Sequence, residues 1–171
     1  MSTDTDDEIV ILRSKDGREF TLSAEAARLS TVVEEAYNDD GGGGGEVEPV
    51  DILRVSADTL EQVVLFLEHH QVESMNEIPT PLNGTSFAEI VSQSWYRTFM
   101  EGKDREAVFD LLTAANYMGI KPLLDLTCLK VTFELTGKNA EEIREILNLP
   151  VLTPEEEATA RQEHKWIFED N

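Results

Sequence analysis

The side chains that most often bind metals or carry out catalysis are few in this sequence. It has one cysteine, Cys128, and three histidines, His69, His70 and His164. A zinc site needs three or four such ligands close together in space. His69 and His70 are adjacent, so their side chains diverge on a helix, while His164 and Cys128 lie far away in sequence. We therefore interpret the histidines as surface residues and expect neither a metal site nor a cofactor.

Cys128 and a run of glycines are the remaining candidates for chemistry. Cys128 lies within the apolar stripe of a predicted helix, where a thiol behaves as a small hydrophobic group in a core or an interface. Residues 41–45 are all glycine, but no strand precedes them and no Lys and Ser or Thr follow to complete a phosphate-binding loop. No nucleophile elbow, zincin pair or dinucleotide fingerprint occurs. These features predict that the protein is not an enzyme.

The charge of the chain restricts its partners. Among 171 residues, 35 are acidic and 14 are basic, which gives a net charge of -21. Such a chain repels phosphate backbones and anionic lipid headgroups, so we expect no nucleic-acid or membrane partner. The longest apolar runs, Ile9–Leu12 and Val63–Leu67, are far shorter than the ~20 residues that span a bilayer. The acidic start and the single cysteine favour a reducing compartment, and we expect a cytoplasmic and nuclear protein.

The first half of the chain predicts a small sheet with helices packed on it. Residues 8–22 have the pattern of a β-hairpin, and Val50–Val55 is a further strand candidate. An amphipathic helix follows, with its apolar residues at helical spacing: Leu60, Val63, Val64 and Leu67. Short helices are expected at 24–28, 30–37 and 95–100. Residues 38–49 and 71–93 are rich in glycine or proline and are expected to be mobile loops.

A helix over Arg105–Met118 places an Asn-Tyr pair away from its apolar side. At ~100° per residue, Tyr117 lies about 180° from Val108 and should face outward, with Asn116 on the flank. Gly119 can supply the left-handed residue that ends this helix. The expected buried stripe is Val108, Leu111, Leu112 and Ala115.

The next helix, Pro122–Leu135, is apolar on two opposite sides. One side carries Leu124, Cys128, Val131 and Leu135, and the other carries Leu126, Leu129 and Phe133. A helix with two apolar faces must be covered from both. One face can pack on the N-terminal core, so the other needs the C-terminal segment or a partner protein.

The C-terminal segment predicts two short, capped helices. Asn139 and Glu142 make one capping pair, and Thr153 and Glu156 make another, with Pro154 at the first helical position. The apolar residues of the first helix form a narrow stripe: Ile143, Ile146 and Leu147. The large apolar residues after the second helix diverge and should fray until a partner covers them: Trp166, Ile167 and Phe168.

Three stretches closely resemble the S-phase-kinase-associated adaptor (Skp) family: "DLLTAANYMGIKPLLDLTC", "GKNAEEIREILNL" and "TPEEEATARQEHKW". Weaker likeness covers most of the remaining chain except 71–93. The resemblance implies an α/β (α+β) fold, with a BTB/POZ domain and a C-terminal all-helical extension. We expect a disordered acidic N-terminus at 1–7, the BTB/POZ-like domain at 8–136 and an F-box-binding extension at 137–171.

The same resemblance implies an adaptor of SCF-type ubiquitin ligases, which bridges a cullin to F-box proteins and catalyses nothing. Carried over by motif, Asn116 and Tyr117 are the expected cullin contacts. The expected F-box contacts are Leu124, Cys128, Ile143, Ile146, Leu147, Trp166 and Ile167. The alternative is an elongin-C-like or BTB-type self-assembling adaptor in another complex, and a homodimer is expected where no F-box partner is present.

Three features of the sequence depart from the family pattern or add to it. The end of the chain reads Trp166-Ile167-Phe168 where the family often has Trp-Cys, and five glycines replace a more acidic loop. Around Pro154 the sequence is similar to a site that some protist members hydroxylate and then glycosylate, whereas a proline that begins a helix is the plainer interpretation.

Overall fold

The computed structural model describes residues 9–39 and 48–167, without the side chains of Asn38, Asp39 and Ile167. The predicted disordered start and most of the 38–49 loop therefore lie outside the described residues. The chain divides into two compact units, Met1–Phe133 and Glu134–Asn171. None of the described helices is both long and apolar enough to cross a membrane.

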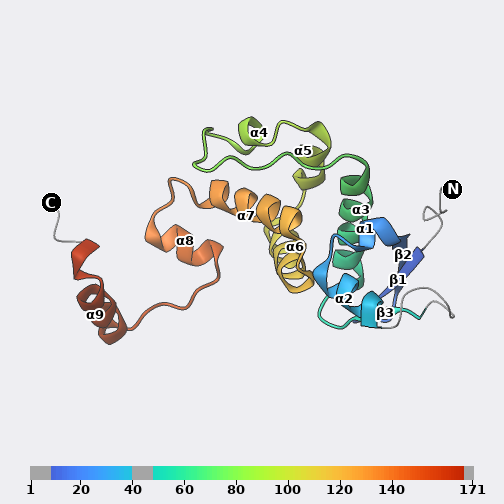
Figure 1. Cartoon of the computed structure of the whole chain (residues 1–171). Helices are drawn as coiled ribbons and strands as arrows, with labels where there is room; N and C mark the ends of the chain where they lie inside the picture. Colours follow the sequence, from blue (N-terminus) through green and yellow to red (C-terminus); the bar gives the residue numbers. More distant parts are fainter. Residues whose placement is uncertain (1–8, 40–47, 168–171) are drawn as a thin grey trace. The chain divides into compact units, whose positions relative to one another are not determined.

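The first unit contains a three-stranded sheet in the order β2-β1-β3 (Figure 1). β1 (Ile9–Ser14) pairs antiparallel with β2 (Glu19–Ser23) and parallel with β3 (Val50–Ile52). Alternate residues of β1 are buried, as expected for a sheet with one face on a core. The predicted hairpin is confirmed. The third strand is shorter than predicted because the chain turns at residues 52–55.

Helices pack beside this sheet and build the rest of the unit (Figure 1). α3 (Ala57–Val72) contacts β2, α1 and α6, so it lies at the centre of the core. The other helices of the unit are α1 (Ala24–Ala27), α2 (Thr31–Asp39), α4 (Phe87–Ile90), α5 (Ser94–Met100) and α6 (Arg105–Met118). α7 (Lys121–Leu135) begins in this unit, and the mixed α/β class that the sequence predicts is confirmed.

The buried face of α6 differs slightly from the predicted stripe. Val108, Leu111 and Ala115 are buried as predicted, but Leu112 is only half-buried. Ala114 and Met118 are buried in its place, because the inward face of the helix is centred between residues 111 and 115. Small alanines on this face allow close approach of the neighbouring helices, and α6 contacts both α2 and α3.

The end of α6 is fixed to the start of α2. Gly119 ends the helix with a positive φ of 68°, as predicted, and the next amide, of Ile120, donates to the Ala115 carbonyl at 2.9 Å. The hydroxyl of Ser30 donates to the Met118 carbonyl at 2.7 Å in a buried position. These bonds satisfy carbonyls that a helix end would otherwise leave unpaired.

The two adjacent histidines at the end of α3 are not the surface residues that the sequence predicted. His70 is buried, and its Nδ1 accepts from the Met75 amide at 3.3 Å and lies 3.0 Å from Tyr96 Oη. Tyr96 in turn donates to the Glu73 carbonyl at 2.5 Å. His69 stacks on Trp95 with ring centroids 3.7 Å apart. The prediction failed because α5 covers this end of α3, which no local pattern indicates.

Burial changes the titration of this cluster. Desolvation lowers the pKa of His70 below 6.5, and the neighbouring His69 adds to the shift. Desolvation together with the charge of Glu73 raises the pKa of Tyr96 to about 12. Both groups are therefore neutral near pH 7.

Replacing Gly119 by alanine should destabilise the protein by about 2–4 kcal/mol. The new Cβ would sit at a left-handed position and overlap Thr31 Oγ1. Gly102→Ala is the matched control, because Gly102 has a φ of +74° but no neighbour near the added carbon. The Gly102→Ala variant should be destabilised by only about 1 kcal/mol. Equal losses in urea denaturation would contradict a packing role for Thr31.

The free energy of unfolding should decrease as the pH falls below 6.5, which is the pKa of an exposed histidine and thus of His70 in the unfolded chain. The unfolded chain binds a proton there before the folded chain does, so unfolding is favoured until the folded pKa is passed. His70→Asn should flatten this dependence between about pH 7.5 and pH 5.5, whereas His164→Asn, at an exposed position, should not. Denaturation at several pH values measures the effect, and an unchanged slope in His70→Asn would contradict it.

Candidate protein-binding surfaces

The first predicted surface lies at the C-terminal end of α6. Asn116 is exposed there, as predicted. Tyr117 is half-buried and packs partly against the core, so it faces outward less completely than predicted. One face of its ring is covered by the guanidinium of Arg54, whose Cζ lies 5.5 Å from the ring centroid. Asn116 and Tyr117 are held in place by the fixed end of α6.

Arg54 reaches Tyr117 from the turn between β3 and α3. The Val55 amide donates to the Ile52 carbonyl at 3.3 Å, and the Val55 carbonyl accepts from the Lys15 amide at 3.0 Å. Ile52 and Val55 are buried, whereas Arg54 is exposed and Leu53 is 70% exposed. The sequence-based prediction missed both tip residues because it extended the strand through Val55. Leu53 and Arg54 are successive large residues, one apolar and one basic, and they break the alternation of buried and exposed residues that a strand would show. This break was the available signal for a turn.

The second predicted surface begins on α7. Leu126 and Leu129 are buried as predicted, together with Leu123 and Thr127, which the sequence reading did not name. The Thr127 hydroxyl is satisfied by donating to the Leu123 carbonyl at 2.9 Å. Residues of the opposite side remain half-buried: Leu124, Val131 and Leu135. Within the first unit, Leu124 and Val131 therefore offer apolar surface beside the buried face.

Cys128 lies on this outer side of α7 and is exposed. The suggestion that it packs in the core was wrong, and only its interface interpretation stays as a prediction. Local desolvation raises the pKa of the Cys128 thiol, and the Asp125 carboxylate adds to the shift. The group is therefore a neutral thiol near pH 7 and a poor nucleophile.

The 71–93 segment belongs to the first unit and forms hydrogen bonds within itself, and its predicted mobility stays a prediction. Val91 is buried, and the side chain of Gln93 accepts from the Asn76 amide at 2.7 Å and donates to Glu73 at 2.8 Å. In α4, the Phe87 ring lies 5.6 Å from the Lys130 ammonium of α7.

The second unit contains α8 (Ala140–Ile146), which starts with the predicted capping box. Asn139 Oδ1 accepts from the Glu142 amide, and Glu142 Oε2 accepts from the Asn139 amide, both at 3.0 Å. The predicted binding stripe is half-buried at each position: Ile143, Ile146 and Leu147.

α9 (Pro154–Glu163) starts with the second predicted box, in which the Thr153 amide donates to Glu156 at 2.8 Å. Pro154 is its first residue and is exposed. A short 3-10 helix, Lys165–Ile167, follows and leaves Trp166 70% exposed. The side chain of Ile167 and the predicted contact at Phe168 lie outside the described residues.

The described part of the second unit, residues 134–166, contains no buried residue. The segment between α8 and α9 also exposes large apolar side chains that the sequence reading did not name: Leu149, Val151 and Leu152. A unit of this kind carries apolar residues without a core of its own to bury them.

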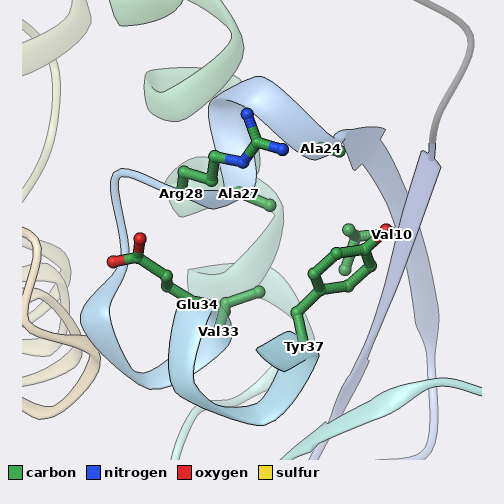
Figure 2. Close-up of a pocket in the computed structure, with 7 residues that line it drawn as sticks. All are labelled: Val10, Ala24, Ala27, Arg28, Val33, Glu34 and Tyr37. Atoms are coloured by element: carbon green, nitrogen blue, oxygen red, sulfur yellow. The ribbon is translucent and has the colours of Figure 1, made fainter. Parts of the chain in front are cut away.

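Potential metal ligands and one small hollow can be located in the described part of the chain. Among 9–39 and 48–167, no group of three or more His, Cys, Asp or Glu residues could hold a metal ion. Figure 2 shows a small hollow between β1, α1 and α2, where the Tyr37 ring lies beside Val10 and where Arg28 and Glu34 stand at the rim. The rest of its lining is aliphatic: Ala24, Ala27 and Val33. These side chains do not form a nucleophile and base pair.

Sequence comparisons identify the family of the chain. The model of the Skp1 family tetramerisation domain matches residues 8–72, and that of the Skp1 family dimerisation domain matches residues 121–167. Two similar relatives from Arabidopsis thaliana are SKP1-like protein 9, 36% identical over 166 residues, and SKP1-like protein 14, 37% identical over 162 residues. Each alignment covers 94% of this chain and 97% of the relative.

A fungal relative carries a functional name. The E3 ubiquitin ligase complex SCF subunit sconC of Arthroderma benhamiae is 33% identical over 161 residues, which cover 94% of this chain and 95% of that protein. The matches thus extend over both units and include both capped helices of the second. This chain belongs to the Skp1 family.

Proposed function

We propose that this chain is the adaptor subunit of an SCF-type cullin ubiquitin ligase and bridges a cullin scaffold to F-box substrate receptors. The observation that carries the proposal is the second unit, whose two capped helices hold apolar residues without burying any of them between 134 and 166. Such a surface suits a protein partner better than a small molecule. The name of the sconC relative, an SCF subunit, supports the same function.

The proposed cullin contacts are Asn116 and Tyr117. Tyrosine is enriched in protein interfaces because it combines a large apolar ring with a hydroxyl that can hydrogen-bond. Here the ring is held at a rigid helix end, so little side-chain freedom is lost on binding. Asn116 is exposed beside it and can donate or accept a hydrogen bond.

The proposed F-box contacts come from both units: Leu124 and Cys128 on α7, Ile143, Ile146 and Leu147 on α8, and Trp166 and Ile167 near the C-terminus. The described residues of this set are half-buried or exposed. Their neutral, mostly aliphatic chemistry suits an apolar helical partner. Trp166 is the proposed anchor, because tryptophan is among the residues that most often dominate interface energy.

The family match at residues 121–167 favours this function over the elongin-C-like alternative, which would lack the second unit. In this proposal the protein has a scaffolding role and no catalytic one. Self-association without an F-box partner stays a prediction, and the exposed apolar segment at Leu149, Val151 and Leu152 supports it. Modification of Pro154 also stays a proposal. Its exposure at the start of α9 supports it, whereas a proline that begins a helix is the plainer interpretation.

Tyr117→Ala should weaken cullin binding by about 2 kcal/mol, roughly 30-fold in Kd, without changing F-box binding. The ring is the largest side chain of the proposed cullin contact. Trp166→Ala is the matched reverse control, which should weaken F-box binding and leave cullin binding intact. Calorimetry with a cullin and with an F-box protein measures both. An unchanged cullin affinity for Tyr117→Ala would refute the assignment of this site.

Removing residues 139–171 should abolish F-box capture and leave the first unit folded. The described residues of this segment contribute no buried side chain, so their loss leaves the core of the first unit intact. Circular dichroism and retained cullin binding would report the intact unit. Capture of an F-box protein by the truncated chain would contradict the proposed role of the second unit.

A further inference from the structure

The contact between Arg54 and Tyr117 joins two segments that are distant in sequence. Arg54 lies on the turn after β3, and Tyr117 lies in the last turn of α6. The guanidinium stands over the ring with 5.5 Å between Cζ and the ring centroid, within the range of a cation–π interaction. A partner that contacts Tyr117 therefore also meets the side chain that covers it.

The turn that carries Arg54 is held rigidly. Its first and last residues, Ile52 and Val55, are 0% and 3% exposed, and its amide-to-carbonyl bond closes at 3.3 Å. A bond from the Lys15 amide ties the turn to the β1–β2 hairpin. The turn therefore projects its two central residues outward in a fixed orientation. Of these, Leu53 is 70% exposed, so its side chain is accessible to a partner.

The guanidinium of Arg54 differs from those of Arg13 and Arg18 in its partners within the described part of the chain. Arg13 pairs with Glu19 and Asp51, and Arg18 pairs with Asp58 and Glu61. By contrast, no carboxylate among the described residues forms an ion pair with Arg54. A guanidinium carries five N–H donors, so a contact with the ring leaves donors available to an acceptor on a partner.

We propose that Leu53 and Arg54 belong to the cullin-binding surface and determine its specificity together with Tyr117. Arg54 positions the Tyr117 ring through its guanidinium face and presents its N–H edge to a carboxylate on the cullin. Leu53 packs beside this pair against apolar cullin surface. The inference rests on the proposed function, because it assigns residues to the partner that binds at Tyr117.

Charge explains why such a pair would select a partner. A protein with a net charge of -21 attracts basic surfaces in general, without distinguishing among them. An arginine that must meet a carboxylate at one position adds a requirement that a uniformly basic partner does not satisfy. A planar, bidentate contact is also more demanding in geometry than a lysine contact.

The test measures binding of the full chain, with an F-box protein bound, to a cullin from the same species. Arg54→Ala should weaken binding about tenfold, and Arg54→Lys should recover only part of this loss. Arg18→Ala is the matched control, because Arg18 is also exposed and its guanidinium lies 5.2 Å from the Phe20 ring centroid. It should bind the cullin as the wild type does.

Two further readouts separate positioning from a general effect on the fold. In the Tyr117→Ala background, Arg54→Ala should reduce the cullin-binding free energy by less than it does in the wild type. The reason is that part of the effect of Arg54 acts through the Tyr117 ring. The affinity of Arg54→Ala should also depend less on salt concentration than that of the wild type. Binding of the F-box protein should not change in any of these variants.

Each outcome has a distinct meaning. If the wild type fails to bind the cullin, the proposed function itself is wrong. If Tyr117→Ala weakens binding while Arg54→Ala binds as tightly as the wild type, only the present inference is overturned. It is also overturned if Arg54→Ala weakens F-box and cullin binding equally, or if Arg18→Ala shows the same loss.

Discussion

The buried hydrogen bond from the Ser30 hydroxyl to the Met118 carbonyl is the contact on which the position of the proposed cullin surface depends. It joins the start of α2 to the end of α6, at the point where Gly119 turns the chain through a left-handed conformation into α7. Thr31 lies so close that a side chain at residue 119 would overlap it. Because this corner is fixed, it also fixes Asn116 and Tyr117, which lie at the end of α6. The start of α7 is fixed in the same way. One local constraint thus sets the orientation of side chains on two helices.

The sequence predicted those features that depend on neighbouring residues. The hairpin, the glycine at the end of α6 and both capping boxes follow from short patterns with direct physical causes, and the structure confirms them. Features that depend on distant contacts were missed or wrong. His69 and His70 are covered by α5, and Leu53 and Arg54 stand on a turn that was read as strand. Cys128 shares an apolar stripe with Leu124, but helical spacing alone does not tell which stripe faces the core. The proposed roles of Asn116, Tyr117 and Cys128 came from the family resemblance, whereas those of Leu53 and Arg54 were inferred from the structure.

The two units differ in the source of their order. In the first, α3 contacts the sheet and α6, and the aromatic cluster of Phe66, Tyr96 and Phe99 closes one end of the core. In the second, α8 and α9 are short helices whose order comes mainly from hydrogen bonds at their starts. Helices of this length are marginal alone in water. Caps contribute about 1 kcal/mol each, which favours the helical form but does not secure it. A protein partner can supply the burial that the chain itself lacks.

The absence of buried side chains between residues 134 and 166 has a kinetic consequence for a chain that acts as proposed. When a segment gains most of its order from the molecule it holds, part of the interaction free energy is spent on that ordering, and the net affinity is lower than the contact area suggests. Lower affinity at a given association rate means faster release. One scaffold subunit can then pass among many receptors, and the relative abundance of those receptors decides which of them occupies the ligase at a given time.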